Sequence, residues 1–374
     1  MKLLLVHRTG PHGLGDRIRV QAIIDFLKNN CYHVQEVCLP LTSASLNDFL
    51  KAMPFMHLTP QFSSINAALK DCRLSVTFNV VYNYLENILK KIEFDAILAE
   101  TTPVGWLILR WLKKHHVTAP LLIDIHGLWF AEAKGWNKKN WLMLKRIESE
   151  TLRDADYLFV VSDAMKDFIT NNLGVDKNKI TVVTNGAPPI EKLSAYKMPF
   201  KVIYAGIFDY YENVDIYLEL TANCSDKRLK FFMAGRGPLL KKILTYIKRE
   251  KAPICFLGYI PRRGMLQILA TFQAGLIFST KDIAREVAFP IKILDYASRG
   301  LPVIAPKIGD WGHLVETEDI GISVENGIAE YANALQVLMD KYIWLRKRRN
   351  CIDFARRYQW RNVLWPMKEV LDKF

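Results

Sequence analysis

The sequence predicts an open, doubly wound α/β fold arranged as two domains of similar size. Short apolar runs rich in β-branched residues recur along the 374 residues, and amphipathic stretches with helical spacing separate them. Such an alternation is typical of a parallel sheet covered by helices on both faces. A proline-rich interruption divides the alternation in two, and a chain of this length is too long for one ordinary hydrophobic core.

In the first half, the sequence predicts six strands, which fall at 2–7, 33–39, 95–100, 120–126, 157–162 and 180–185. Helical spacing appears between them, at 16–30 and 104–116. The region 43–80 carries mixed signals and supports no prediction. Ligands of open parallel sheets lie beyond the carboxyl ends of the strands, so a cleft between the two halves is the expected ligand site.

Residues 185–199 contain three prolines and no apolar periodicity, which is typical of a linker. The alternation then resumes, with strands predicted at 201–207, 229–235, 254–259, 275–279, 301–306 and 321–324. The predicted domains are therefore 1–187 and 201–357, joined by a linker at 188–200.

The charge balance favours anionic partners. Lys and Arg number 51 against 38 Asp and Glu, a net charge of +13, which suits nucleotide phosphates, nucleic acid or acidic lipid. No nucleic-acid motif accompanies this charge, so nucleic acid is not an expected partner. The six cysteines lack disulfide or metal-ligand spacing, and no run approaches the roughly 20 apolar residues of a membrane span. We expect a cytoplasmic chain that does not cross a membrane and holds no metal.

Two glycine turns are candidates for anion binding. Gly13 and Gly15 follow the first predicted strand and open the first helix, where unpaired N–H groups suit a phosphate, and Arg17 comes next. In the second half, 232–243 reads as a strand, a glycine turn and a helix start, and Arg236 can reach a phosphate there. For both turns the alternative is a plain chain reversal with exposed arginines.

His126 stands just past a predicted strand and next to Gly127, so it is expected to face the cleft. Histidine is the side chain best able to exchange a proton near neutral pH. The nearby carboxylates, Asp124 and Glu132, are candidates to orient it or to bind ligand hydroxyls. A purely structural histidine remains the alternative.

Residues 134–146 combine lysines and an arginine with tryptophans and leucines, a composition typical of segments that lie on an anionic bilayer surface. An ordinary solvated helix with core tryptophans is the alternative. The stretch 341–349 allows the same two interpretations, with the second favoured. A peripheral position at the inner face of a membrane is therefore left open.

The stretch 286–305 is the most specific. If 289–299 is a helix that begins near Pro290, then Lys292 and Asp295 share one face. A cation at the amino-terminal end suits a phosphate, and a carboxylate one turn later can accept hydrogen bonds from both ribose hydroxyls. The alternative is a surface Lys–Asp pair, worth only about 0.2–0.5 kcal/mol.

This stretch resembles the signature of the retaining glycosyltransferases of the GT-B fold, family 4 (group 1). The matching residues are Glu286, Phe289, Pro290, Asp295, Ala297 and 300–305. Further marks of the family follow one another along the chain, at 7–19, 124–127, 153–162, 179–186, 204–206, 233–238 and 358–360. The resemblance thus covers nearly the whole sequence.

The resemblance implies two Rossmann-like domains facing a central cleft, with the nucleotide on the second, the acceptor on the first, and 358–374 crossing back to the first. It implies transfer of a sugar, with retention and without a metal or other cofactor, from a UDP- or GDP-sugar donor to a glycan or lipid-linked acceptor. The donor-binding candidates are Gly13, Gly15, Arg17, Gly206, Arg236, Arg285, Phe289, Pro290 and Asp295, and the catalytic candidates are Lys292, His126 and Glu286.

Several positions depart from the family pattern. The family has an arginine and a lysine on the donor diphosphate where this chain has Ile207 and Glu212, so Lys292 is the best substitute, followed by Arg236 and Arg285. Asp295 replaces the usual glutamate. Glu286 lies nine residues before Asp295 rather than eight, and the usual spacing selects Val287.

Two rival functions remain open. One is a nucleotide-sugar epimerase of the same fold, which converts donor without an acceptor. The other is a degenerate, non-catalytic binding subunit, suggested by Ile207 and Glu212.

Overall fold

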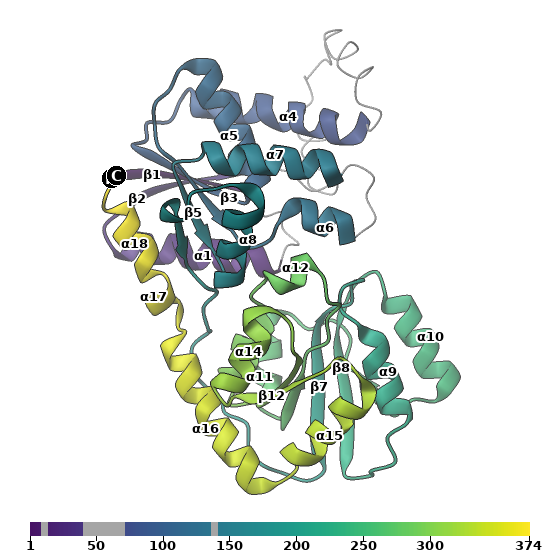
Figure 1. Cartoon of the computed structure of the whole chain (residues 1–374). Helices are drawn as coiled ribbons and strands as arrows, with labels where there is room; N and C mark the ends of the chain where they lie inside the picture. Colours follow the sequence, from purple (N-terminus) through teal and green to yellow (C-terminus); the bar gives the residue numbers. More distant parts are fainter. Residues whose placement is uncertain (9–13, 40–71, 136–140) are drawn as a thin grey trace.

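The computed structural model describes residues 1–8, 14–39, 72–135 and 141–374. It contains two six-stranded sheets whose strands are all parallel, stacked one above the other in Figure 1. All twelve predicted strands are confirmed. The predicted helices at 16–30 and 104–116 are confirmed as α1 (Leu14–Asn29) and α5 (Thr102–His115).

The first sheet has the strand order β2-β1-β3-β4-β5-β6. Its strands are β1 (Lys2–His7), β2 (His33–Cys38), β3 (Ala96–Glu100), β4 (Leu121–Ile125), β5 (Tyr157–Val160) and β6 (Ile180–Val182). Its remaining helices are α4 (Cys72–Leu89), α6 (Trp129–Gly135), α7 (Trp141–Asp154) and α8 (Asp163–Leu173). Successive residues of β1 point to opposite faces and are buried on both, which explains the unbroken apolar run.

The second sheet has the order β12-β11-β10-β7-β8-β9. Its strands are β7 (Phe200–Ile207), β8 (Leu229–Arg236), β9 (Ile254–Phe256), β10 (Ala274–Leu276), β11 (Val303–Pro306) and β12 (Gly321–Val324). Its helices are α9 (Val214–Ala222), α10 (Leu240–Glu250), α11 (Arg262–Leu269), α12 (Ile283–Glu286), α13 (Ile291–Ala297), α14 (Gly309–Thr317) and α15 (Ile328–Leu338). The central strand β7 pairs with β8 over eight residues, which brings Gly206 level with Gly235.

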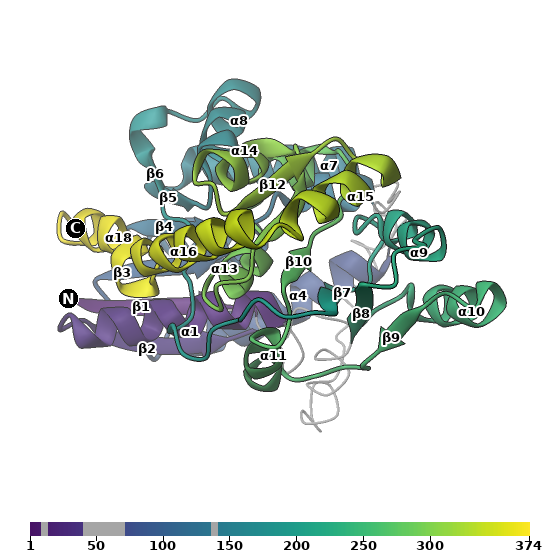
Figure 2. The same ribbon diagram turned by 90° about the horizontal axis from the view of Figure 1, so that it is seen from below.

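The last three helices return to the first sheet. Helix α16 (Lys341–Arg357) runs from the second sheet toward α17 (Trp360–Val363) and α18 (Trp365–Leu371), as Figures 1 and 2 show. Met367 and Leu371 of α18 belong to the same buried cluster as Leu3 and Leu5 of β1. The chain thus crosses between the sheets twice, and the crossings touch where Ala187 pairs with Gln359.

No helix in the described part of the chain is long and apolar enough to span a membrane. The region 43–80, for which the sequence supports no prediction, falls largely outside the described residues, and its described end begins α4. The cysteines with described side chains are free thiols: Cys31, Cys38, Cys224, Cys255 and Cys351.

Candidate functional site

Two adjoining cavities lie at the carboxyl ends of the strands. The first has a volume of about 200 Å³ and is walled by β7, β8, α11 and α13. It is called the nucleotide-side cavity because the family resemblance implies that the second domain holds the nucleotide. The cleft cavity, of about 340 Å³, lies between the two sheets and contains residues of both. Lys292 lines both cavities, together with Ile207 and Ile291. A ligand extending from one cavity into the other therefore passes Lys292.

Most of the predicted site residues line these cavities. Gly206, Arg236, Lys292 and Asp295 line the nucleotide-side cavity, while His126, Arg285, Phe289, Pro290 and Lys292 line the cleft cavity. Arg17 lies on a third, larger cavity beside them. Gly15 lies in the first turn of α1, and Gly13 falls outside the described residues.

Glu286 is not among the residues that line the two cavities. It ends the short helix α12, whose first turn is capped by the Asp282 carboxylate accepting from the Arg285 N–H. The family spacing selects Val287, which is buried and whose carbonyl accepts a 2.6 Å hydrogen bond from the Ser162 hydroxyl. Of Glu286, Val287 and Ala288, it is Ala288 that lines the cleft cavity.

Lys292 forms an ion pair with Glu212, the residue that stands where the family resemblance implies a lysine. Its Nζ lies 2.6 Å from Glu212 Oε2 and over the Tyr204 ring, 4.9 Å from the centroid. The Tyr204 hydroxyl donates to the same carboxylate oxygen at 2.8 Å. Burial first, and then the charge of Glu212, raise the pKa of Tyr204 well above its usual value, so this hydroxyl stays a donor.

Gly206 makes room for this lysine. A Cβ at position 206 would lie 2.5 Å from Lys292 Cε and 2.9 Å from Nζ. Gly235 and Gly237 have φ of +149° and +153°, and a Cβ at either would overlap backbone atoms of Gly206 or Phe208. The glycine turn of β8 is therefore explained first by close packing of two neighbouring strand ends.

Asp295, the predicted ribose ligand, is held by a residue that the sequence reasoning missed. Arg262, the first residue of α11, donates from Nη2 to Asp295 Oδ1 at 2.5 Å, and both side chains are largely buried. Burial raises the pKa of Asp295, and the Arg262 charge opposes that shift. The pair keeps the carboxylate charge compensated at the wall of the nucleotide-side cavity.

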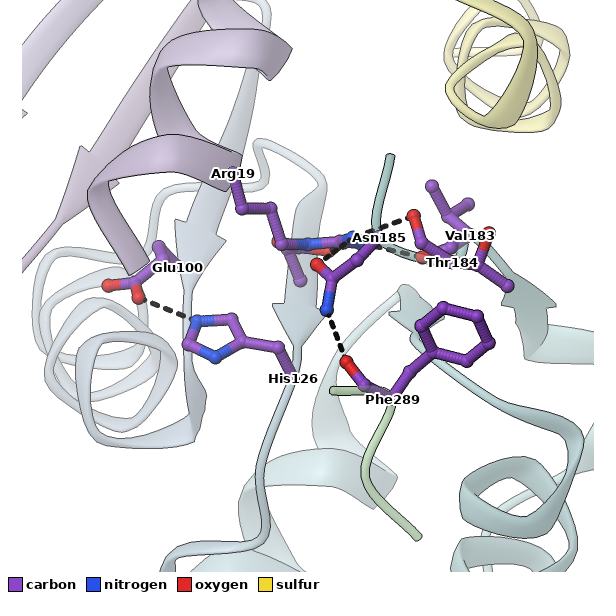
Figure 3. A network of polar contacts seen from close by, with 8 residues as sticks. Arg19, Glu100, His126, Val183, Thr184, Asn185 and Phe289 are labelled. Carbon is purple, nitrogen blue, oxygen red and sulfur yellow. Dashed lines mark hydrogen bonds and ion pairs between the residues drawn. The ribbon is translucent and has the colours of Figure 1, made fainter. Parts of the chain in front are cut away.

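His126 is oriented by another residue that the sequence reasoning missed. Its Nε2 lies 2.7 Å from Glu100 Oε1, as Figure 3 shows, and Glu100 Oε2 accepts from the Arg8 N–H at 3.1 Å. Burial alone would raise the pKa of Glu100, but the hydrogen bond and charge of His126 outweigh it and lower that pKa. Glu100 ends β3 beside Asp124 of β4, so strand adjacency could have found it.

Asp124 neither orients His126 nor faces the cavity. Its carboxylate accepts from Arg19 Nε at 2.7 Å and Nη2 at 2.6 Å, and both side chains are 1% exposed. The Arg19 guanidinium also donates to the carbonyls of Val183 and Thr184 (Figure 3). This bidentate pair fixes α1 against the ends of β4 and β6.

A buried hydrogen bond then joins the two domains across the cleft. Asn185 Nδ2 donates to the Phe289 carbonyl at 2.7 Å (Figure 3). The Phe289 ring stacks on the ring of Tyr358, with an angle of 9° between the two ring planes. Tyr358 belongs to the segment that leads into α17. Phe289 thus sits at the cleft cavity because residues of both chain crossings hold it.

Besides Lys292, the two cavities are lined by two other predicted donor-binding cations, Arg285 and Arg236, and both lie over aromatic rings. The Arg285 guanidinium is 4.4 Å from the Tyr211 ring centroid, and its Nε is buried with no hydrogen bond to the described residues. The Arg236 guanidinium is 4.3 Å from the Tyr259 centroid. Arg236, Lys292 and Arg285 therefore supply cations at the nucleotide side, at the junction and at the cleft side.

Residues 134–146 fall on α6 and α7, with 136–140 outside the description. Lys134 Nζ lies 5.0 Å from the Trp141 ring centroid, and Trp141 is partly buried. Leu142 is 62% exposed, and Met143 36%. Within the described ranges, no three His, Cys, Asp or Glu side chains form a group that could hold a metal ion.

The chain matches two family models. Residues 68–186 match the glycosyl transferase 4-like domain, and residues 199–341 match glycosyl transferases group 1.

Individual relatives are more distant. A glycogen synthase of Mycobacterium tuberculosis is 22% identical over 247 residues, which cover 62% of this chain and 58% of the synthase. The UDP-Gal:alpha-D-GlcNAc-diphosphoundecaprenol alpha-1,3-galactosyltransferase of Escherichia coli is 23% identical over 349 residues, 87% of this chain and 85% of that enzyme. The solved structure of Anabaena HepE in complex with UDP superposes with a TM-score of 0.73 at 16% identity, covering 100% of both chains. At that identity the likeness establishes the fold.

Proposed function

The chain belongs to the group 1 glycosyltransferases of the GT-B fold, and we propose that it moves a sugar from a UDP-sugar to a glycan or lipid-linked acceptor. A GDP-sugar is the second candidate donor. The choice of UDP is supported by Anabaena HepE, solved with UDP, and by the E. coli relative, named for UDP-Gal. The lipid-linked acceptor is supported by the diphosphoundecaprenol in the name of that same relative.

The observation that carries this proposal is the position of Lys292 between the two cavities. A nucleotide sugar has its ribose on one side of a diphosphate and its sugar on the other. In the proposed complex, the ribose hydroxyls bind Asp295, the diphosphate binds Lys292 with Arg236, and the sugar occupies the cleft cavity beside Phe289 and Pro290. Stabilising the departing diphosphate is the main electrostatic contribution of the chain.

We propose transfer with retention and without a metal ion. A phosphate oxygen of the departing nucleotide takes the proton of the acceptor hydroxyl, so the reaction needs no protein base. His126, which Glu100 holds at the cleft cavity through Nε2, binds a hydroxyl of the sugar or acceptor through Nδ1 and fixes its position. In the proposed complex, Arg285, which lines the cleft cavity, contacts the diphosphate from that side.

The Glu212–Lys292 pair favours a second candidate, the non-catalytic binding subunit. In the free protein the proposed phosphate cation is already neutralised, 2.6 Å from a carboxylate. On this alternative the chain binds a nucleotide, or nothing, and transfers no sugar.

One experiment separates the candidates. Calorimetry against UDP-sugars and GDP-sugars is followed by incubation with undecaprenyl diphosphate-linked N-acetylglucosamine, and the anomeric configuration of the product is read by NMR. Donor binding with a retained linkage, unchanged by EDTA, supports the proposal. Donor binding without turnover favours the binding subunit, and donor conversion without acceptor indicates an epimerase.

We further propose a cytoplasmic chain that lies against the inner face of a membrane through 134–146. The support is an exposed apolar pair, Leu142 and Met143, on the same helix as Lys145 and Arg146. Sedimentation with vesicles containing phosphatidylglycerol tests it. Binding that weakens with salt and in Leu142→Glu supports the proposal, and no binding at low salt refutes it.

A further inference from the structure

A third cavity, the outer groove, opens beside the nucleotide-side cavity and is larger than it. Its volume is about 1060 Å³, and its walls come from α1, α11, α17 and the first residue of α18, together with the end of β8 and Tyr259 in the segment after β9. Helices α1 and α11 lie on the same side of the molecule in Figure 2. Pockets of about 300–1,000 Å³ hold drug-sized ligands, so the outer groove exceeds the needs of a single phosphate ion.

The outer groove is lined by four arginines and one acid. The arginines are Arg17, Arg236, Arg262 and Arg361, and the acid is Asp25. Arg17 on α1 and Arg361 on α17 are both exposed. Guanidinium groups bind carboxylates and phosphates in a bidentate manner, so this charge balance selects an anionic ligand.

Aromatic and amide side chains complete the walls of the outer groove. Trp365 is 49% exposed and Tyr259 42%, and the edge of the Phe26 ring braces Trp365 at 6.3 Å between centroids. The amides are Gln21, Asn29, Asn30 and Asn362. Flat apolar rings beside amides suit the faces and hydroxyls of sugar rings, whereas a phosphate ion alone would need neither.

We propose that the outer groove binds an anionic oligosaccharide, whose sugar faces stack on Trp365 and Tyr259 and whose carboxylates pair with Arg17 and Arg361. It is a site distinct from the donor site and from the acceptor position in the cleft cavity. The preference for a glycan over another polyanion rests on the amides and on the proposed function, which makes glycans the molecules this chain handles.

Arg262 connects this site to the nucleotide. Arg262 lines both the outer groove and the nucleotide-side cavity, and its guanidinium pairs with Asp295. Ribose hydroxyls that donate hydrogen bonds to the Asp295 carboxylate leave Arg262 able to turn toward an anion in the outer groove. Nucleotide and oligosaccharide should therefore bind together rather than compete.

The test is calorimetry of the full chain with a hexasaccharide of alternating glucuronate and N-acetylglucosamine, with and without saturating UDP. We expect salt-dependent binding that is at least as tight with UDP present. Arg361→Ala and Trp365→Ala should each weaken it about tenfold, the scale of one charge-assisted hydrogen bond or one ring stack, while UDP affinity and melting temperature stay unchanged. Matched controls are Arg146→Ala on α7 and Tyr342→Ala on α16, both exposed and away from the outer groove.

Four outcomes overturn the proposal: equal binding of neutral maltohexaose, displacement of the hexasaccharide by UDP, tighter binding of a single-stranded oligonucleotide, or wild-type affinity in both groove variants. If the wild type does not bind UDP, that result contradicts the proposed function rather than the outer-groove proposal. Because hexasaccharide binding is measured without turnover, the two failures are distinguishable.

Discussion

Lys292 Nζ lies 2.6 Å from Glu212 Oε2, at the junction of the nucleotide-side and cleft cavities. The two residues are 80 positions apart, and Glu212 stands where the family resemblance implies a donor-binding lysine. The side chains are only 20% and 13% exposed, so the pair is weakly screened by solvent. In the proposed complex, the donor diphosphate therefore replaces the Glu212 carboxylate as the anion at Lys292.

Glu212→Gln should tighten UDP binding by about tenfold, or ~1.4 kcal/mol, because the competing carboxylate is removed while the Tyr204 hydrogen bond can persist. Calorimetry measures this directly. Asp215→Asn is the matched control, since Asp215 is an exposed acid paired with Lys242 on the same side of the domain. Weaker binding in Glu212→Gln would show that the carboxylate positions Lys292 rather than competing for it.

Lys292→Ala should lower kcat by at least about 100-fold, the scale of losing one preorganised group that stabilises the leaving charge. The fold should persist, because Lys292 is only partly buried and its removal leaves Tyr204 still bonded to Glu212. Initial rates and a melting curve are the measurements, with Lys242→Ala as the control. Near-normal turnover in Lys292→Ala would show that Lys292 does not stabilise the departing diphosphate.

Asp295→Asn should weaken UDP binding by about tenfold, since the charged acceptor for the ribose hydroxyls is lost. The sharper measurement is the affinity ratio between UDP and 2′,3′-dideoxy-UDP. Wild type should prefer UDP strongly, and the variant should lose that preference. An unchanged ratio would mean that Asp295 serves only to hold Arg262.

The buried carboxyl of Glu148 should make stability depend on pH. It accepts hydrogen bonds from Thr102 Oγ1 at 2.8 Å and from the Phe130 N–H at 3.0 Å, and burial raises its pKa from 4.5 to about 7. The stability it contributes is complete below about pH 4.5, where both states are protonated, and declines as the pH rises toward 7. One pKa unit is about 1.36 kcal/mol, so the decline amounts to roughly 3 kcal/mol.

In urea unfolding at about pH 4.5 and about pH 7.5, the wild type should therefore lose stability relative to Glu148→Gln as the pH rises. Glu150→Gln, at an exposed position on the same helix, is the control. Parallel pH profiles for wild type and Glu148→Gln would contradict the raised pKa.

The fold was accessible from the sequence because unbroken apolar strands alternate with helices, and that pattern survives without any tertiary information. Placement of Lys292 and Asp295 on one short helix could be predicted because Pro290 marks the helix start and the two residues are three positions apart, and α13 confirms it. Their partners were not, because Glu212 and Arg262 reach them from other elements, and spacing within a helix says nothing about such contacts.

His126 shows an intermediate case. Its place at a strand end could be predicted from the sequence. Identifying its partner Glu100 required the knowledge that β3 and β4 are neighbours. Asp124, the nearer carboxylate in sequence, turned out to be occupied by Arg19, which helix α1 brings from 105 positions away.

The two chain crossings touch at Ala187 and Gln359, and the hydrogen bond from Asn185 to Phe289 lies next to them. We expect the two domains to rotate about this edge, because such a rotation stretches neither covalent connection. Opening would then swing α14 away from α8, breaking the 2.6 Å contact between Asp310 and the Ala164 N–H. A donor bound across both cavities, as proposed, would hold the two domains closed. Release of that donor would then depend on the angle between the domains.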